Sequence, residues 1–313
     1  MADNWNWRDD RIPRIDGKRV IVTGAASGLG AYIAEALSAK GAFVVLADKD
    51  IIGARSVADR IRSSVPGAEP TVHELDLADL DSIERFASWY QAEHNTLDIL
   101  INNAGIMTPP YGRTAQGFES QIGVNHLGHF ALTYHLFPLL SATTGSRLVT
   151  QTSIVHRGGK INFQDINSER SYSPWNAYKQ SKLATLLFSR ELDRRLSYIG
   201  VDAPMSIACH PGLVNTQLYR NRERMRSWLR PFMHDLEAGA MPALRAALDP
   251  AAKGGQIYGA GGWMEFKGPA VLVPPHRRGK DMELASRVWD LSEKMTGLDL
   301  SARIKERRPS ASR

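Results

Sequence analysis

The stretch RVIVTGAASGLGAYIAEALSAKG (19–41) decides the fold, because it joins a strand to a helix through a glycine-rich loop. Its first part, RVIVTG (19–24), has the β-branched content of a buried strand. Its second part, GLGAYIAEALSAKG (28–41), has apolar residues at helical spacing and closes on a glycine. A strand that passes directly into a helix in this way is the first half of a βαβ unit.

The same alternation of short β-branched runs and longer helical patterns continues along the chain. Further strands are expected at FVVLAD (43–48), TVHELD (71–76), LDILINNAG (97–105), SRLVTQTS (146–153) and MSIACHPG (205–212). Strands that alternate with helices at this spacing predict a parallel sheet covered on both faces, with right-handed crossovers. The expected class is therefore α/β, a doubly wound parallel sheet.

The domain organisation follows from what interrupts this pattern. No internal repeat or linker-like stretch occurs between residues 17 and 300, so this part is expected to form a single domain. Residues 1–16 are expected to be an N-terminal extension. Residues 301–313 are polar and contain Pro309, and they are expected to be a flexible basic tail.

The basic balance of the chain is local. With 39 Lys and Arg against 33 Asp and Glu, the formal net charge is +6. The surplus lies in residues 220–230 and 301–313, each of which has five basic residues and one acidic residue, so the remainder is slightly acidic. This distribution argues against a broad nucleic-acid surface, and no nucleic-acid partner is expected.

Several classes of protein are excluded by composition. No window reaches the roughly 18 uninterrupted apolar residues of a membrane-spanning helix, and the opening MADNWNWRDD lacks the apolar stretch of a secretory signal. The single cysteine, Cys209, cannot form an internal disulfide and is expected to be a buried core thiol. A cytoplasmic protein without a transmembrane anchor is expected. Nothing resembles a metal-ligand cluster, so no metal site is expected.

The glycine-rich loop VTGAASGLG (22–30) is a candidate dinucleotide cradle. It places Gly24, Gly28 and Gly30 in a G-x-x-x-G-x-G arrangement where the strand gives way to the helix. Glycines let the loop turn tightly and let its backbone approach a pyrophosphate, whose charge the helix N-terminus then meets. A glycine-rich turn that binds nothing is the alternative, and its place in the first βαβ unit argues against that alternative.

Asp48, at the end of the second expected strand, bears on the choice of dinucleotide. An acidic side chain there can accept both hydroxyls of the adenosine ribose, and its carboxylate repels a 2′-phosphate. The sequence therefore favours NAD over NADP. Lys49 follows directly and can pair with such a phosphate, so NADP stays open.

A second candidate site lies in the helical pattern at 176–196. Tyr178 and Lys182 are four residues apart, so their side chains share one face. A phenol in water has a pKa of about 10, and a nearby ammonium favours the phenolate form that proton transfer needs. Such pairs are common on ordinary exposed helices. Ser153 adds a third group at the expected end of the fifth strand, the edge where open parallel sheets bind ligands.

Together these motifs resemble the short-chain dehydrogenase/reductase family. TGAASGLG (23–30), NNAG (102–105), Ser153, YKQSK (178–182) and HPG (210–212) occur in the family's order and at suitable spacing. The resemblance covers about residues 17–300. It implies a Rossmann-type sheet of about seven parallel strands in which dinucleotide and substrate share one domain.

The resemblance also implies roles for individual residues. Tyr178 is implied to be the general acid/base, Lys182 its activator and ribose ligand, Ser153 the partner of the substrate oxygen, and Asn125 the holder of a water in a proton relay. For Asn125, an amide that bonds its own helix is the structural alternative. Asn102 and Gly105 match the loop that supports the central sheet and the adenosine ribose. The implied cofactor-binding residues are Gly24, Ser27, Gly28, Leu29, Gly30, Asp48, Asp76, Leu77, Asn103, Ala104, Gly105, Tyr178, Lys182, Pro211, Gly212, Val214 and Thr216.

The chain departs from the common pattern of the family at two points, and these bear on the branch to which it is most similar. Ser153 and Tyr178 are 25 residues apart, about twice the common spacing, and the longer insert 154–177 resembles the branch of retinol dehydrogenases and protochlorophyllide reductase. Those relatives usually have a basic residue without the Asp at the end of the second strand and use NADP. They are also commonly membrane-associated. Asp48 puts their cofactor preference in doubt here.

The substrate side is expected in the 106–118 loop, the 154–177 insert and the segment after Thr216. An apolar helical face within 221–237, made of Met225, Trp228, Leu229 and Phe232, is consistent with a lid at 213–237, a surface helix or an interfacial helix. The expected substrate is apolar or amphiphilic. In many relatives the helices after Ala104 and around Tyr178 pair, which implies a homodimer or homotetramer.

The expected function is therefore an NAD(P)-dependent oxidoreductase that interconverts an alcohol and a ketone or aldehyde. A nucleotide-binding sensor without catalysis is an alternative, although such a protein has no need for the Tyr178–Lys182 pair. A sugar-nucleotide epimerase or dehydratase also uses Tyr-x-x-x-Lys. Enzymes of that class typically have a G-x-x-G-x-x-G loop and a C-terminal domain larger than the one this chain offers.

Overall fold

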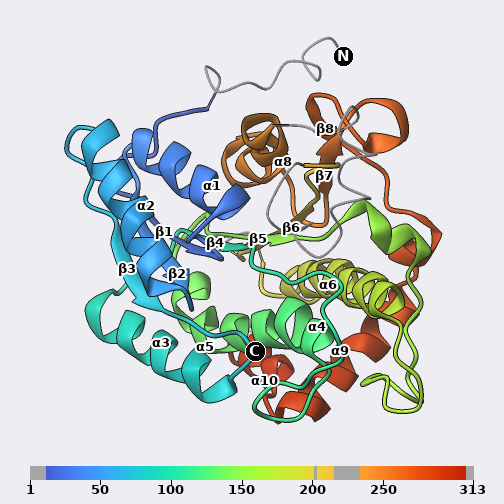
Figure 1. The fold of residues 1–313 in the computed structure, drawn as a ribbon. Coiled ribbons are helices and arrows are strands. Elements are labelled where there is room, and N and C mark those ends of the chain that lie inside the picture. Colours follow the sequence, from blue (N-terminus) through green and yellow to red (C-terminus); the bar gives the residue numbers. More distant parts are fainter. Residues whose placement is uncertain (1–11, 201–202, 215–232, 234, 308–313) are drawn as a thin grey trace.

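An eight-stranded sheet forms the centre of the protein (Figure 1). The computed structural model describes residues 12–200, 203–214, 233 and 235–307. The strand order is β3-β2-β1-β4-β5-β6-β7-β8, in which β1 to β7 run parallel and β8 is antiparallel to β7. The strands are β1 Arg19–Thr23, β2 Phe43–Asp48, β3 Thr71–Glu74, β4 Ile99–Asn102, β5 Arg147–Gln151, β6 Met205–Cys209, β7 Ile257–Ala260 and β8 Ala270–Leu272. The doubly wound Rossmann-type sheet is confirmed, and the antiparallel edge strand is an addition to it.

Helices cover both faces of the sheet (Figure 1). One face carries α1 (Gly28–Ala39), α2 (Ile51–Ser64) and α8 (Leu236–Leu248), and the other carries α3 (Leu80–Glu93), α5 (Gly128–Ala142) and α6 (Pro174–Leu196). Beyond these, α9 (Met282–Thr296) packs on α6, and α10 (Leu300–Glu306) packs on α5. Shorter pieces are α4 (Ser120–Ile122), a π-helical turn (Gly123–Leu127) and 3₁₀ turns at Ile154–Gly158, Trp263–Glu265 and Arg277–Lys280.

The strand β1 shows why both faces are buried. Val20 and Val22 belong to the core under α1 and α8, whereas Ile21 belongs to the core under α3 and α5. Successive side chains of a strand point to opposite faces, so a continuous apolar run requires cover on both. The run in RVIVT therefore places β1 in the middle of the sheet, between β2 and β4.

A crevice for ligands follows from this position. The chain winds from β1 outward to β2 and β3, then returns to place β4 on the other side of β1. Loops at the carboxyl ends of β1 and β4 consequently leave in opposite directions, which opens the sheet edge at this switch point. The glycine loop and the 103–105 loop face each other there. A Cβ on Gly24 would lie 2.8 Å from Ala104 Cα, so this close approach requires glycine.

Both chain ends are more ordered than expected where the structure describes them. Ile12 is buried, and the Ile15 amide donates to the Lys40 carbonyl at 2.8 Å, so the extension joins the body from residue 12. The prediction of a flexible tail from residue 301 is wrong for residues 301–306, which belong to α10. Leu300 and Ile304 lie four residues apart and are both buried, because the helix packs an apolar face against α5.

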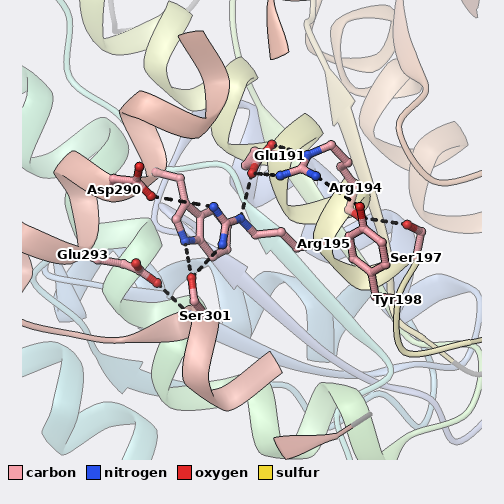
Figure 2. A network of polar contacts seen from close by, with 9 residues as sticks. Glu191, Arg194, Arg195, Ser197, Tyr198, Asp290, Glu293 and Ser301 are labelled. Carbon is pink, nitrogen blue, oxygen red and sulfur yellow. Dashed lines mark hydrogen bonds and ion pairs between the residues drawn. The ribbon is translucent and has the colours of Figure 1, made fainter. Parts of the chain in front are cut away.

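An ionic cluster around the buried Glu191 joins these C-terminal helices to α6 (Figure 2). Glu191 is fully buried and accepts hydrogen bonds from Arg194 and Arg195. Arg195 also donates to Ser301 Oγ at 2.7 Å, and its guanidinium lies 4.5 Å from the centre of the Trp289 ring. Trp289 Nε1 donates to the same Ser301 oxygen at 2.9 Å. The cluster therefore anchors the last turn of α6 to α9 and α10.

Part of the surface expected for oligomer formation is covered within the chain, because α9 lies on α6 and α10 lies on α5.

Within the described residues, no helix combines the length and apolar character needed to cross a membrane.

Replacing Ile304 by Ala should lower the free energy of unfolding by about 2–4 kcal/mol, because it leaves a cavity between α10 and α5. Lys305→Ala is the matched control in the same helix turn, since Lys305 is exposed, and it should change stability by less than about 0.5 kcal/mol. Urea denaturation measures both. Equal effects of the two variants would contradict the packing of α10.

Candidate active site

A cavity of about 810 Å³ opens at the carboxyl ends of the parallel strands. The described residues expected to bind the dinucleotide all line it: Gly24, Ser27, Gly28, Leu29, Gly30, Asp48, Asp76, Leu77, Asn103, Ala104, Gly105, Tyr178, Lys182, Pro211, Gly212 and Val214. Ser153 lines it as well. Asn125 is not on its wall, and Thr216 lies outside the described residues. The structure therefore gathers residues from seven separate segments of the chain into one site.

The glycine loop presents the N-terminus of α1 to this cavity. Ser27 is the N-cap of α1, and its side chain makes no capping hydrogen bond, so it does not occupy the first-turn amides. Gly30 is required inside the loop, since a Cβ there would lie 2.1 Å from the Gly24 carbonyl oxygen. A glycine-rich loop without side chains in the way, at the N-terminus of a helix, suits the binding of a pyrophosphate.

The far end of the cavity is acidic. Asp48 accepts hydrogen bonds from the Ala26 amide at 2.9 Å and from the Asp50 amide at 3.0 Å, one on each carboxylate oxygen. These bonds hold the carboxylate against the glycine loop while further lone pairs stay available for a ribose hydroxyl. Asp76 accepts from the Ala78 amide at 2.9 Å and so shapes the turn that carries Leu77.

The loop after β4 is fixed through Asn103 and through Gln151, a residue that the sequence analysis did not single out. Asn103 Nδ2 donates to the Thr23 carbonyl at 2.8 Å, and Gln151 Nε2 donates to Asn103 Oδ1 at 3.0 Å. Gln151 is the last residue of β5 and has no motif around it that marks this role. Asn102 is buried at the end of β4, and its Nδ2 donates to Thr133 Oγ1 at 3.4 Å.

Asn125 lies behind the cavity wall in the π-helical turn. Its Oδ1 accepts from the Ile106 amide at 2.8 Å, and its Nδ2 donates to the Ile106 carbonyl at 3.0 Å and to Ser181 Oγ at 2.9 Å. The side chain therefore braces the loop after β4 and does not bond its own helix, contrary to the structural alternative. Its role in a proton relay stays a prediction.

Tyr178 and Lys182 lie on neighbouring turns of α6 and are both buried. Lys182 Nζ donates to the Gln151 carbonyl at 3.0 Å. Burial removes the ammonium from water and lowers the pKa of Lys182 to about 8. A Cβ on Gly105 would lie 3.4 Å from that nitrogen, so the glycine leaves room beside the cation.

Ser153 lies two residues beyond the end of β5 rather than within the strand. It is the N-cap of the 3₁₀ turn Ile154–Gly158, because Ser153 Oγ accepts from the Val155 amide at 3.5 Å. Its carbonyl accepts from His156 Nδ1 at 2.7 Å. The turn therefore directs Ser153 to the same cavity wall as Tyr178.

The remaining wall is mostly apolar. Its residues come from the 106–118 loop, the 154–177 insert, the loop after β6 and the β7–β8 connection: Met107, Ile154, Val155, Trp175, Leu213 and Phe266. The Trp175 ring lies 5.8 Å from the Tyr178 ring. Phe266 was not anticipated. Met225, Trp228, Leu229 and Phe232 of the expected lid lie outside the described residues.

Cys209 is a buried thiol, as expected. Burial raises its pKa to about 12, so it stays protonated at neutral pH. Over residues 12–200, 203–214, 233 and 235–307, no group of three His, Cys, Asp or Glu side chains is arranged to hold a metal ion.

Comparison with known proteins assigns the family. A family model for short chain dehydrogenase matches residues 18–227, and the chain belongs to this family. Retinol dehydrogenase 12 of Homo sapiens is 39% identical over 288 residues, which cover 91% of this chain and 88% of that protein. Retinol dehydrogenase 14 of Mus musculus is 39% identical over 303 residues, which cover 90% and 86%. The resemblance to the retinol dehydrogenase branch is confirmed, and the chain is an NAD(P)-dependent short-chain oxidoreductase.

Solved structures of similar proteins support the same family assignment. An uncharacterized protein from Mycobacterium paratuberculosis superposes with a TM-score of 0.79 at 39% identity, covering 94% of this chain and 98% of that one. A short chain dehydrogenase from Shigella flexneri complexed with NADP has a TM-score of 0.61 at 25% identity, covering 79% and 98%.

The depressed pKa of Lys182 should appear in stability measurements. Between pH 8 and pH 10.5 the unfolded chain binds a proton at this lysine that the folded chain has released, so the free energy of unfolding rises with pH across that window. Relative to Lys182→Met, the wild type should gain roughly 3 kcal/mol over this range. Urea denaturation at several pH values tests this, and parallel pH profiles would contradict it.

Proposed function

We propose that this protein interconverts a lipophilic alcohol and the corresponding aldehyde or ketone, with Tyr178 as the general acid/base. The observation that carries the proposal is the single cavity in which Ser153, Tyr178 and Lys182 lie between the glycine loop and an apolar wall. Relatives named retinol dehydrogenase support a lipophilic substrate.

A nicotinamide dinucleotide fits the other half of the cavity. The first-turn amides of α1 suit its pyrophosphate, and the Asp48 carboxylate suits the adenosine ribose. When bound, the dinucleotide supplies or accepts the hydride. The residues after β6, Pro211 to Val214, form the wall on the nicotinamide side.

The residues of this chain then manage the proton. Ser153 Oγ holds the substrate oxygen beside the Tyr178 hydroxyl. In oxidation, Tyr178 as phenolate takes the proton of the substrate hydroxyl, and in reduction its phenol gives that proton back. The Lys182 ammonium favours the phenolate through its positive charge and holds the nicotinamide ribose. The apolar wall excludes water, which strengthens these charge interactions.

We further propose that NAD is the preferred dinucleotide. The carboxylate of Asp48 is held at the ribose end of the cavity by two backbone amides, where it opposes a 2′-phosphate. Lys49 lines the same region and is the group that would favour NADP.

Tyr178→Phe should lower kcat by about 10²- to 10⁴-fold, because the proton donor is removed while ring packing against Trp175 is kept. All-trans-retinol and a series of alkyl alcohols are suitable test substrates. The dissociation constant for the dinucleotide, measured by fluorescence titration, should stay within about threefold of wild type, since no pyrophosphate or adenosine contact is changed. Wild-type turnover in this variant would overturn the proposed role of Tyr178.

Titration with NADH and NADPH should show tighter binding of NADH to the wild type. Asp48→Ala should reduce that preference by about tenfold or more, which corresponds to about 1.4 kcal/mol, because it removes both a ribose acceptor and a negative charge. A wild type that binds NADPH more tightly would contradict the reading of Asp48.

A further inference from the structure

Three segments far apart in the chain meet behind the nicotinamide-side wall. They are the loop after β6 with His210, the 3₁₀ turn after Ser153 with Arg157, and the turn Trp263–Glu265 between β7 and β8. The His210 side chain is fully buried and that of Glu265 is 16% exposed. The mechanism above uses none of these three side chains, yet they lie directly behind residues that line the cavity.

Their contacts form a chain that ends on a backbone amide of the wall. Arg157 makes an ion pair with Glu265 Oε1, and His210 Nε2 donates to Glu265 Oε2 at 2.8 Å. At its other end the ring accepts from the Gly212 amide, with 3.3 Å between Gly212 N and His210 Nδ1. A neutral imidazole with its proton on Nε2 satisfies both contacts at once. We call Arg157, Glu265 and His210 the loop brace.

The loop after β6 is held at two successive amides. Besides the Gly212 amide on His210, the Leu213 amide donates to the Phe266 carbonyl at 2.9 Å. Gly212 has φ +72°, and a Cβ there would lie 2.5 Å from the Phe266 carbonyl oxygen. The two segments therefore touch without an intervening side chain, and a shift of one moves the other.

The turn that supplies Glu265 is itself strained. Met264 and Glu265 have φ of +51° and +59°, a left-handed conformation that is unfavourable for residues other than glycine. Burial disfavours the Glu265 carboxylate, but the hydrogen bond from His210 and the charge of Arg157 outweigh it, so the pKa of Glu265 lies below its usual value. The two charge-assisted contacts of Glu265 offset the strain and give the turn one defined geometry.

We propose that Arg157, Glu265 and His210 are positioning residues that, by holding the Gly212 amide, pre-organise the loop 211–214 for the nicotinamide half of the dinucleotide. The inference rests on the proposed oxidoreductase function, because it assigns the wall formed by Pro211, Gly212 and Val214 to the nicotinamide. Without the brace, the loop after β6 occupies its binding geometry for only part of the time. The apparent dissociation constant rises by the inverse of that fraction, while a saturating ligand restores the geometry.

The test compares three variants by dinucleotide affinity and by kinetics. Glu265→Ala removes both contacts and should raise the dissociation constant for NADH, measured by fluorescence titration, about tenfold. The KM for the dinucleotide should rise in parallel, and kcat at saturating dinucleotide should fall less than about threefold. Glu265→Gln keeps an acceptor for His210 and should lie between wild type and Glu265→Ala. Glu69→Ala removes an exposed carboxylate paired with Arg62 and should match wild type.

Two further measurements separate the outcomes. Thermal unfolding reports whether Glu265→Ala folds. If it does not, Arg157→Met, which loses only the partly exposed end of the brace, should still raise the dissociation constant about threefold. A folded Glu265→Ala that binds NADH as tightly as wild type overturns the loop brace, whatever its melting temperature. A wild type that binds no nicotinamide dinucleotide instead overturns the proposed function.

Discussion

The hydroxyl of Thr23 holds together the crevice on which the active site depends. It is fully buried at the end of β1 and accepts the amides of Asn103 and Ala104, each at 3.0 Å. The same oxygen lies 3.0 Å from His129 Nε2. Since His129 Nδ1 donates to the Asn125 carbonyl at 3.1 Å, its Nε2 is the acceptor and the Thr23 hydroxyl is the donor. Burial lowers the pKa of His129 to about 4, which keeps the ring neutral and this arrangement intact. One hydroxyl therefore ties β1 to the loop after β4 and to His129 of α5, which in turn bonds the π-helical turn.

A continuous series of polar contacts leads from this point to Lys182, one of the groups proposed to act in catalysis. Asn103 donates to the Thr23 carbonyl and accepts a hydrogen bond from the side chain of Gln151. The backbone carbonyl of Gln151 in turn accepts from Lys182 Nζ. Lys182, the proposed ribose ligand, is thus linked to the loop after β4 through one glutamine at the end of β5. A buried ammonium is costly, because this one hydrogen bond does not fully replace its contacts with water, and burial lowers the pKa of Lys182 to about 8. In the proposed complex, the dinucleotide ribose would supply further oxygen ligands to this ammonium.

The sequence allowed prediction of those features that depend on local spacing. The apolar run of β1, the glycine loop and the four-residue separation of Tyr178 and Lys182 each involve neighbours within one turn or one strand, so their geometry follows from regular secondary structure. The prediction of a flexible tail from residue 301 is wrong at α10. The five basic residues in 301–313 favour a solvated tail in the sequence, and they hide the apolar pair Leu300 and Ile304 that the helix buries. Ser153 was placed one element too early, because a serine at a strand end and a serine that caps the next turn have the same local sequence.

The sequence by itself determined the class of sheet, the site at its switch point and the residues proposed to handle the proton. It could do so because each belongs to a short motif whose partners are close along the chain. Only the tertiary structure decided that Glu265 meets His210, which precedes it by 55 residues, and that both meet Arg157 from the insert. No periodicity records such a contact, since it arises where three connections converge at one edge of the sheet. Long-range packing therefore determined the shape of the wall proposed for the nicotinamide, while the local sequence pattern determined the side chains beside it.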